Sequence, residues 1–156
     1  MRREDFTLEV RDIDWVEDGD EPRRPTVTID FQGPADELQK RLMGPAGEVL
    51  DAEETDVAYR LHAESVDGDA SGVVGVTNRI TGDFILELNV DADDVLTFIR
   101  AARRYGKHAD GDGQYRVCIR IDGDEFVTYD KETFLVYNHA GELLRGDSLI
   151  PSGVEL

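Results

Sequence analysis

Basic side chains concentrate in one short stretch of an otherwise acidic sequence. Residues 100–120 include six lysines and arginines but only two acids, Asp110 and Asp112. Guanidinium groups bind carboxylates and phosphates with two parallel hydrogen bonds, so such a cluster is suited to holding an anion or an acidic segment of a partner. An apolar residue among the arginines adds a contact of the kind found at docking sites. The predicted binding residues are Leu96, Arg100, Arg103, Arg104, Lys107, Arg116 and Arg120.

A plainer interpretation of the same residues is a solvated helix face. Cations near the end of a helix complement its dipole and pair with nearby carboxylates without binding a ligand. Nucleic-acid binding is a weaker alternative, because its affinity falls steeply with salt and the chain has a formal net charge of -18. A protein partner or self-association is therefore the expected use of the surface, and nucleic acid is not.

Cys118 is the one residue that suggests covalent chemistry. It alternates out of phase with the apolar residues of its strand and lies between Arg116 and Arg120, whose charges would stabilise a thiolate. No general base stands beside it in the sequence, and the nearest histidine, His108, falls in a predicted loop. We expect a small buried thiol, with an enzyme that uses Cys118 or a carboxylate pair as the alternative. The 35 acids do not let one pair be chosen.

Metal and cofactor motifs are incomplete or missing. Asp67, Asp69, Ser71 and Gly72 match the first half of a calcium loop, but Asn78 stands where the bidentate Glu belongs. These residues are better explained as an Asp/Gly turn, and Asp122-Gly123 is also typical of a turn. The three histidines are scattered, and the sequence has no nucleotide-binding glycine loop or hydrolase motif. We expect no metal and no cofactor.

Alternating apolar residues predict the strands that must carry these side chains. The alternation is clearest over 6–10, 27–31, 57–61, 84–90 and 115–121. After Val10 the apolar phase shifts to Ile13 and Trp15, which predicts a β-bulge near Arg11 or Asp12. The strands follow one another through turn sequences, which favours antiparallel hairpins.

Two helices are predicted between the strands. The main one covers about 91–106, with Asp91 as its cap, Gly106 at its end and an apolar side formed by Val95, Phe98, Ile99, Ala102 and Tyr105. A short one covers about 34–43. The expected fold is α+β, a mostly antiparallel sheet of hairpins with one main amphipathic helix, in a single domain of residues 1–156.

The composition indicates a salt-adapted protein. There are 35 Asp and Glu against 17 Lys and Arg, with an isoelectric point near 4.3, and only three lysines. Self-repulsion of this size opposes compaction at low salt but is screened over about 3 Å in 1 M salt. The single cysteine, the absence of a secretory signal and the absence of an apolar run of about 20 residues predict a cytoplasmic protein away from the membrane.

Three segments give the chain a resemblance to other sequences: VGVTNRITGDFILELN (Val74–Asn89), DADDVLTFIRAARRYG (Asp91–Gly106) and SLIPSGVEL (Ser148–Leu156). Through them it resembles an uncharacterised haloarchaeal protein family, a domain of unknown function. That resemblance implies salt adaptation but no activity and no functional residues. The leading hypothesis is a non-catalytic binding or regulatory domain that docks a partner or anion through the arginine-rich helix face.

Overall fold

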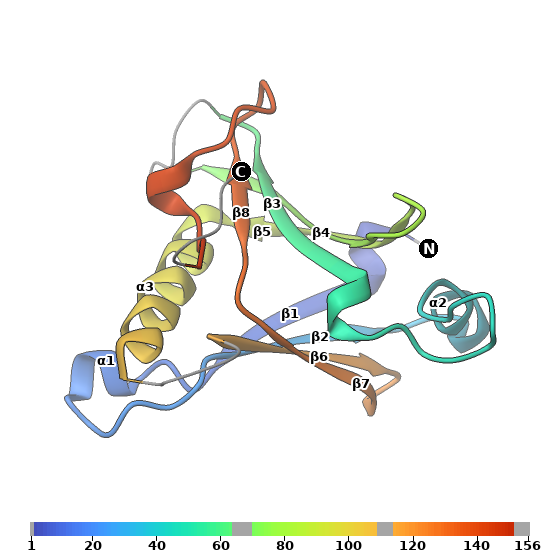
Figure 1. Cartoon of the computed structure of the whole chain (residues 1–156), viewed down its shortest axis with the longest axis horizontal. Coiled ribbons are helices and arrows are strands. Elements are labelled where there is room, and N and C mark those ends of the chain that lie inside the picture. The colour runs from blue at the N-terminus through green and yellow to red at the C-terminus, as the bar shows by residue number, and fades with distance from the viewer. Residues whose placement is uncertain (1, 64–69, 109–113, 152–156) are drawn as a thin grey trace.

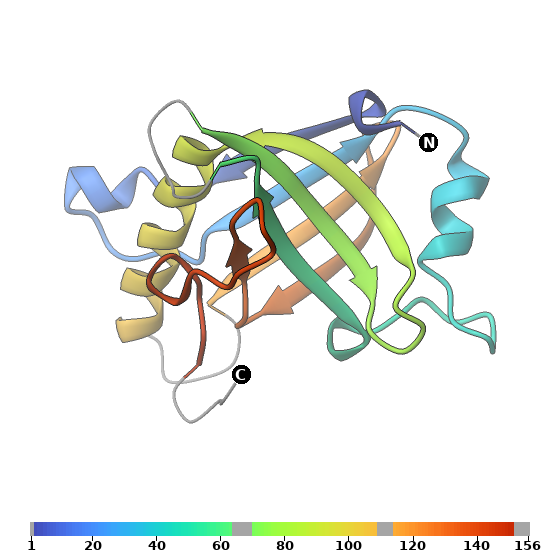
Figure 2. The same ribbon diagram turned by 90° about the horizontal axis from the view of Figure 1, so that it is seen from above.

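Two four-stranded sheets face each other across one hydrophobic core (Figure 1). The computed structural model describes residues 2–63, 70–108 and 114–151. Sheet 1 has the order β1-β2-β6-β7, and sheet 2 has the order β5-β4-β3-β8. Seen from above, the strands of sheet 2 cross those of sheet 1 (Figure 2). The strands are β1 (Phe6–Arg11), β2 (Thr26–Phe31), β3 (Thr55–Leu61), β4 (Ser71–Asn78), β5 (Phe84–Asp91), β6 (Tyr115–Ile121), β7 (Asp124–Lys131) and β8 (Leu135–Tyr137).

The predicted α+β class is confirmed, and each sheet is mixed. Neighbouring strands along the chain pair antiparallel, as expected for hairpins, in β1–β2, β3–β4, β4–β5 and β6–β7. The β6–β7 turn has positive φ at Asp122 and Gly123, which is the geometry that Asp-Gly favours in a two-residue hairpin. Two pairs are parallel instead: β2 with β6 and β3 with β8. The single sheet of hairpins is therefore replaced by two sheets joined through crossovers.

The helices cover the open ends of this two-sheet core. Helix α3 (Ala92–His108) lies across one end, and α2 (Ala35–Arg41) lies at the opposite end (Figures 1 and 2). Val95, Phe98, Ile99 and Ala102 of α3 are buried, as the apolar periodicity predicts, whereas Tyr105 is only half-buried. The ring of Phe98 meets Tyr115 edge-on, with 5.1 Å between centroids. Sheet 1, sheet 2 and α3 thus share one core.

Two local predictions were wrong. The expected bulge near Arg11 and Asp12 is instead the end of β1, followed by a short helix, α1 (Trp15–Asp18), in which Trp15 is buried. Because the chain leaves the strand there, the apolar phase shifts without a bulge. Gly106 does not end α3, since the helix continues to His108. The short 3-10 helices are η1 (Arg3–Asp5), η2 (Ala52–Glu54) and η3 (Arg145–Asp147).

Lys131 joins the two sheets from within. It is the last residue of β7, only 7% of its surface is exposed, and its Nζ donates hydrogen bonds of 2.6 Å to the carbonyl oxygens of Ala52 and Thr55. Those acceptors lie in η2 and at the start of β3. Burial, and then the charge of Arg79, lower the pKa of the Lys131 ammonium group. A buried cation is stable there because two carbonyl oxygens replace its water.

Candidate functional site

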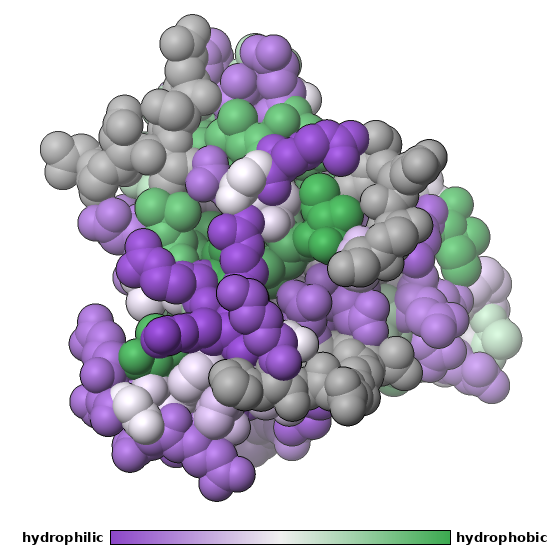
Figure 3. Space-filling view, turned by 60° about the vertical axis from the view of Figure 1, so that its left-hand side comes forward, coloured by the Kyte–Doolittle hydropathy of each residue, from purple (hydrophilic) through white to green (hydrophobic). Residues whose placement is uncertain are grey.

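The cationic face of α3 borders a groove, here called the α3 groove. It has a volume of about 310 Å³ and lies between α3 and η3. Figure 3 shows this side of the molecule, with hydrophobic residues exposed between hydrophilic ones. The residues that line the groove are Leu96, Ile99, Arg100, Arg103, Arg104, Lys107 and Asp147. The structure thus brings four of the predicted basic residues and Leu96 together, and it adds Ile99 and Asp147, which were not among the residues predicted for this surface.

Arg103 and Arg104 are held in place by backbone carbonyl groups. Arg103 donates from Nη2 to the carbonyl oxygen of Gly146 and, at 3.0 Å, to that of Ser148. Arg104 donates from Nη1 to the carbonyl oxygen of Val16 at 3.0 Å, which ties α3 to α1. Each guanidinium has five N–H donors, so these bonds fix its orientation without using all of them. The two arginines serve the fold and also hold positive charge beside the groove.

Arg100 and Lys107 are exposed, like Arg103 and Arg104, but they are not held by carbonyl oxygens. Within the described ranges, neither side chain forms a hydrogen bond or an ion pair. Leu96 is half-buried next to them, and Ile99 beneath is buried. Asp147 is the one carboxylate among the lining residues. The groove therefore combines positive charge with a partly apolar floor.

Arg116 and Arg120 do not belong to this surface. The inward residues of β6, Tyr115 and Val117, face α3 across the core, so alternation places both arginines on the outer face of sheet 1. Arg116 donates from Nε to Asp130 Oδ1 at 2.9 Å.

Asp130 also accepts from Arg24 Nη1 at 3.1 Å. Burial alone would raise the pKa of Asp130, but Arg116 and Arg24 outweigh it and lower that pKa. The structure therefore divides the seven predicted residues into five at the α3 groove and two outside it, of which Arg116 is in a carboxylate pair.

Cys118 lies between these two arginines, on the outer face of sheet 1. It is 9% exposed, and its Sγ is 3.7 Å from Glu125 Oε1. A hydrogen bond from Thr128 is the largest cause of the lowered pKa of Glu125, with smaller contributions from Cys118 and the arginines. His62 and His139 lie beyond the core on sheet 2, so neither can act as a base for this thiol. Glu125 and Asp130 both have lowered pKa values, and a proton donor requires a raised one, so neither of these two acids is suited to that role.

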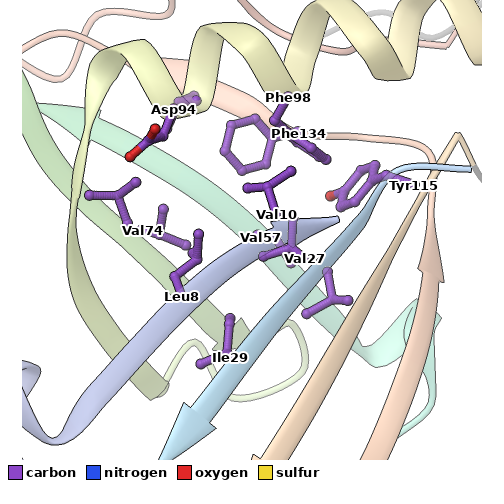
Figure 4. A pocket seen from close by; sticks show the side chains of 13 residues that line it. Leu8, Val10, Val27, Ile29, Val57, Val74, Asp94, Phe98, Tyr115 and Phe134 are labelled. Carbon is purple, nitrogen blue, oxygen red and sulfur yellow. The ribbon is translucent and has the colours of Figure 1, made fainter. Parts of the chain in front are cut away.

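A small cavity lies inside the core between the sheets and α3 (Figure 4). Its volume is about 20 Å³, and Asp94 of α3 is the one charged residue in a lining that is otherwise hydrophobic apart from the Tyr115 ring. A space of this size holds about one water molecule, and apolar cavities stay dry. The cavity is a packing defect rather than a ligand site.

Metal ligands do not converge in the part of the chain that the structure describes, where no three His, Cys, Asp or Glu side chains could hold one ion. Asp67, Asp69, Asp110 and Asp112 lie outside the described residues, while Ser71 and Gly72 belong to β4. Among the described helices, none is both long and apolar enough to cross a bilayer.

Comparison with known proteins identifies a family. The model of a family of unknown function, DUF5793, matches residues 1–156, so the chain belongs to that family. No curated protein and no solved structure matches the chain significantly.

Proposed function

We propose that this member of DUF5793 is a non-catalytic binding domain that holds an acidic segment of a partner protein in the α3 groove. The observation that carries the proposal is the local reversal of charge. Four cations and two apolar side chains line the groove with one carboxylate, in a chain whose formal net charge is -18. The complement of such a groove is a segment that presents carboxylates around an apolar residue.

Preorganisation supports this assignment. Arg103 and Arg104 are already oriented by carbonyl oxygens, so binding would not have to immobilise two long flexible side chains. Arg100 and Lys107 remain available for charge-assisted hydrogen bonds. Nucleic acid fits less well, because the net charge repels a polyanion and four cations release few counterions.

The proposal includes the cellular setting, a salt-adapted cytoplasm, and a single folding unit. Three lysines among 17 basic residues and 35 acids support salt adaptation. A single unit is supported by the interleaving of the sheets, since sheet 1 contains strands from both halves of the chain. Regulation would then occur through occupancy of the α3 groove and not through chemistry.

A labelled peptide tests the groove directly. We would measure fluorescence anisotropy with a short fluorescein-labelled peptide rich in Asp and Glu around a central Leu, in buffer of fixed high salt. The double variant Arg100→Ala/Lys107→Ala should bind about tenfold more weakly, because each exposed charge contributes roughly 0.5–1 kcal/mol. Both side chains lie outside the bonds that hold the fold, so the variant should remain folded.

The matched control is Arg11→Ala/Lys40→Ala, which removes the same charge from exposed positions in β1 and α2. This control should bind the acidic peptide like the wild type. Neither the wild type nor the control should bind a peptide with Asn and Gln in place of the acids. Equal loss in both double variants would reduce the effect to net charge and contradict the proposal. Concentration-dependent dimers that Arg100→Ala/Lys107→Ala abolishes would instead identify a second copy of the chain as the partner.

A further inference from the structure

The outer face of sheet 2 has a hollow whose shape comes from two small residues. Ala58 of β3 and Gly75 of β4 are cross-strand partners and both point outward at the centre of the sheet. Larger side chains surround them, and the resulting groove, here called the sheet 2 groove, has a volume of about 400 Å³. That volume is in the range of small-molecule sites.

Aromatic rings form the walls of the sheet 2 groove. Phe84 is 58% exposed, unusual for a phenylalanine, and its ring lies over Gly75, where an added Cβ would be 3.7 Å from Cε1. Tyr137 of β8 lines the other side and is half-buried. A flat ring could lie on the Ala58–Gly75 floor with its face or edge against Phe84, as aromatic ligands commonly do.

Cations flank this floor at two places, one on the β5 side next to Glu87, the partner of Gly75, and one further along β3 at Arg60. Arg3 is held by Glu87 Oε2 at 3.0 Å, and Arg60 is held by the carbonyl oxygen of His139 at 2.9 Å. Phe84 pairs with Thr77 of β4, which in turn pairs with Asp56 of β3. Arg60 lies four residues after Asp56 on β3, which corresponds to roughly 14 Å. His62 and His139 also line the groove, and Glu87 is the one carboxylate in the lining.

A second hollow on the far side of Phe84 adds to the positive charge. Arg2, Arg3 and Arg41 line it together with the Phe84 ring and Glu87. The net charge of the chain repels anions from a distance, but salt at physiological strength screens charges beyond about 8 Å. A ligand in the sheet 2 groove would therefore experience mainly the nearby arginines.

We propose that the sheet 2 groove binds a small planar aromatic anion, with its ring on Ala58 and Gly75 against Phe84 and its acidic group at Arg60 or Arg3. This site is separate from the α3 groove, which lies at the end of the sheets. Neither site requires the other.

The test uses the fluorescence of 1-anilinonaphthalene-8-sulfonate, an aromatic anion, with N-phenyl-1-naphthylamine as the same ring system without the sulfonate. The wild type should bind one equivalent of the sulfonate. Phe84→Ser and Gly75→Val should each weaken binding about tenfold, the first by removing the ring contact and the second by filling the hollow. Valine suits a strand, and its Cβ would meet Phe84 at an ordinary distance, so Gly75→Val should fold.

The control for Phe84→Ser is Ile80→Ser, which removes another exposed apolar side chain, 66% exposed and outside the groove. It should bind the sulfonate like the wild type, as should Arg100→Ala/Lys107→Ala. Arg60→Gln should reduce the preference for the sulfonate over the neutral amine about fivefold. The proposal is overturned if the wild type does not bind the sulfonate, if Phe84→Ser and Gly75→Val bind it as Ile80→Ser does, or if the wild type binds both compounds equally.

Discussion

Replacing Lys131 with Met tests whether the contact between the two sheets depends on its ammonium group. Methionine keeps an apolar stem of similar length but leaves the carbonyl oxygens of Thr55 and Ala52 without their donor. A buried unsatisfied acceptor lowers the free energy of unfolding by about 1–3 kcal/mol. The variant regains part of this because it no longer buries a charge. The Ala52 oxygen is only partly buried, so water can reach it. We expect a net loss of about 2 kcal/mol, or ~4–8 °C in Tm for a chain of this length.

Urea unfolding followed by circular dichroism at constant high salt measures this difference. Lys40→Met is the matched control, because Lys40 is an exposed lysine on α2, and such substitutions change stability by about 0.5 kcal/mol or less. If Lys131→Met unfolds at the same urea concentration as Lys40→Met, the two carbonyl contacts do not stabilise the fold and our account of Lys131 is refuted.

The pH dependence gives a second signature of the same residue. Burial lowers the pKa of Lys131 below its ordinary value of 10.5, so near that pH the unfolded chain holds the proton more tightly than the folded chain. The contribution of Lys131 to stability then rises with pH in this window. The wild type should therefore gain stability relative to Lys131→Met as the pH approaches 10.5.

Three further outcomes are expected. Gly72→Ala should lower Tm, at a cost of about 1–3 kcal/mol, because the new Cβ would clash with the backbone carbonyl oxygen of Arg60 and lie 2.8 Å from Tyr59 Cζ, whereas Gly146→Ala, with open space around it, should not. Absorbance at 295 nm should show Tyr59, Tyr115 and Tyr129 resisting ionisation at pH 10–11, because burial raises their pKa values, that of Tyr129 to about 12. Because the folded chain keeps these tyrosines protonated and the unfolded chain does not, their contribution to stability is fully present below about pH 10 and is lost as the pH rises further. Tm should therefore fall in alkaline buffer. Dialysis into dilute buffer should lower Tm and loosen the fold, as seen by circular dichroism, because 35 carboxylates are then unscreened; an unchanged melt would contradict salt adaptation.

Local patterns in the sequence predicted the strands and α3 well, because they depend on nearest neighbours. The alternation of Phe84, Leu86, Leu88 and Val90 and the Asp122-Gly123 turn required no knowledge of distant contacts. The parallel pairs could not be predicted in this way. Strand β2 ends at Phe31 and its partner β6 begins at Tyr115, so their pairing depends on tertiary packing.

The candidate sites were predictable to different degrees. The stripe on α3 follows from helical periodicity, so Leu96, Arg100 and Lys107 were found. Alternation placed Arg116 on the opposite face of its strand, a clue against grouping it with the helix. The sheet 2 groove was missed, since Ala58 and Gly75 are unremarkable until β3 and β4 align them.

The order in which the strands are joined has a consequence for synthesis on the ribosome. Strands β1 and β2 are translated early, but the inner edge of β2 has no partner until β6 emerges, after the whole β3-β4-β5 meander. An unpaired strand edge invites association with other chains. The nascent polypeptide therefore carries an open edge through most of its elongation, and a stop codon before Tyr115, where β6 begins, would leave that exposure permanent.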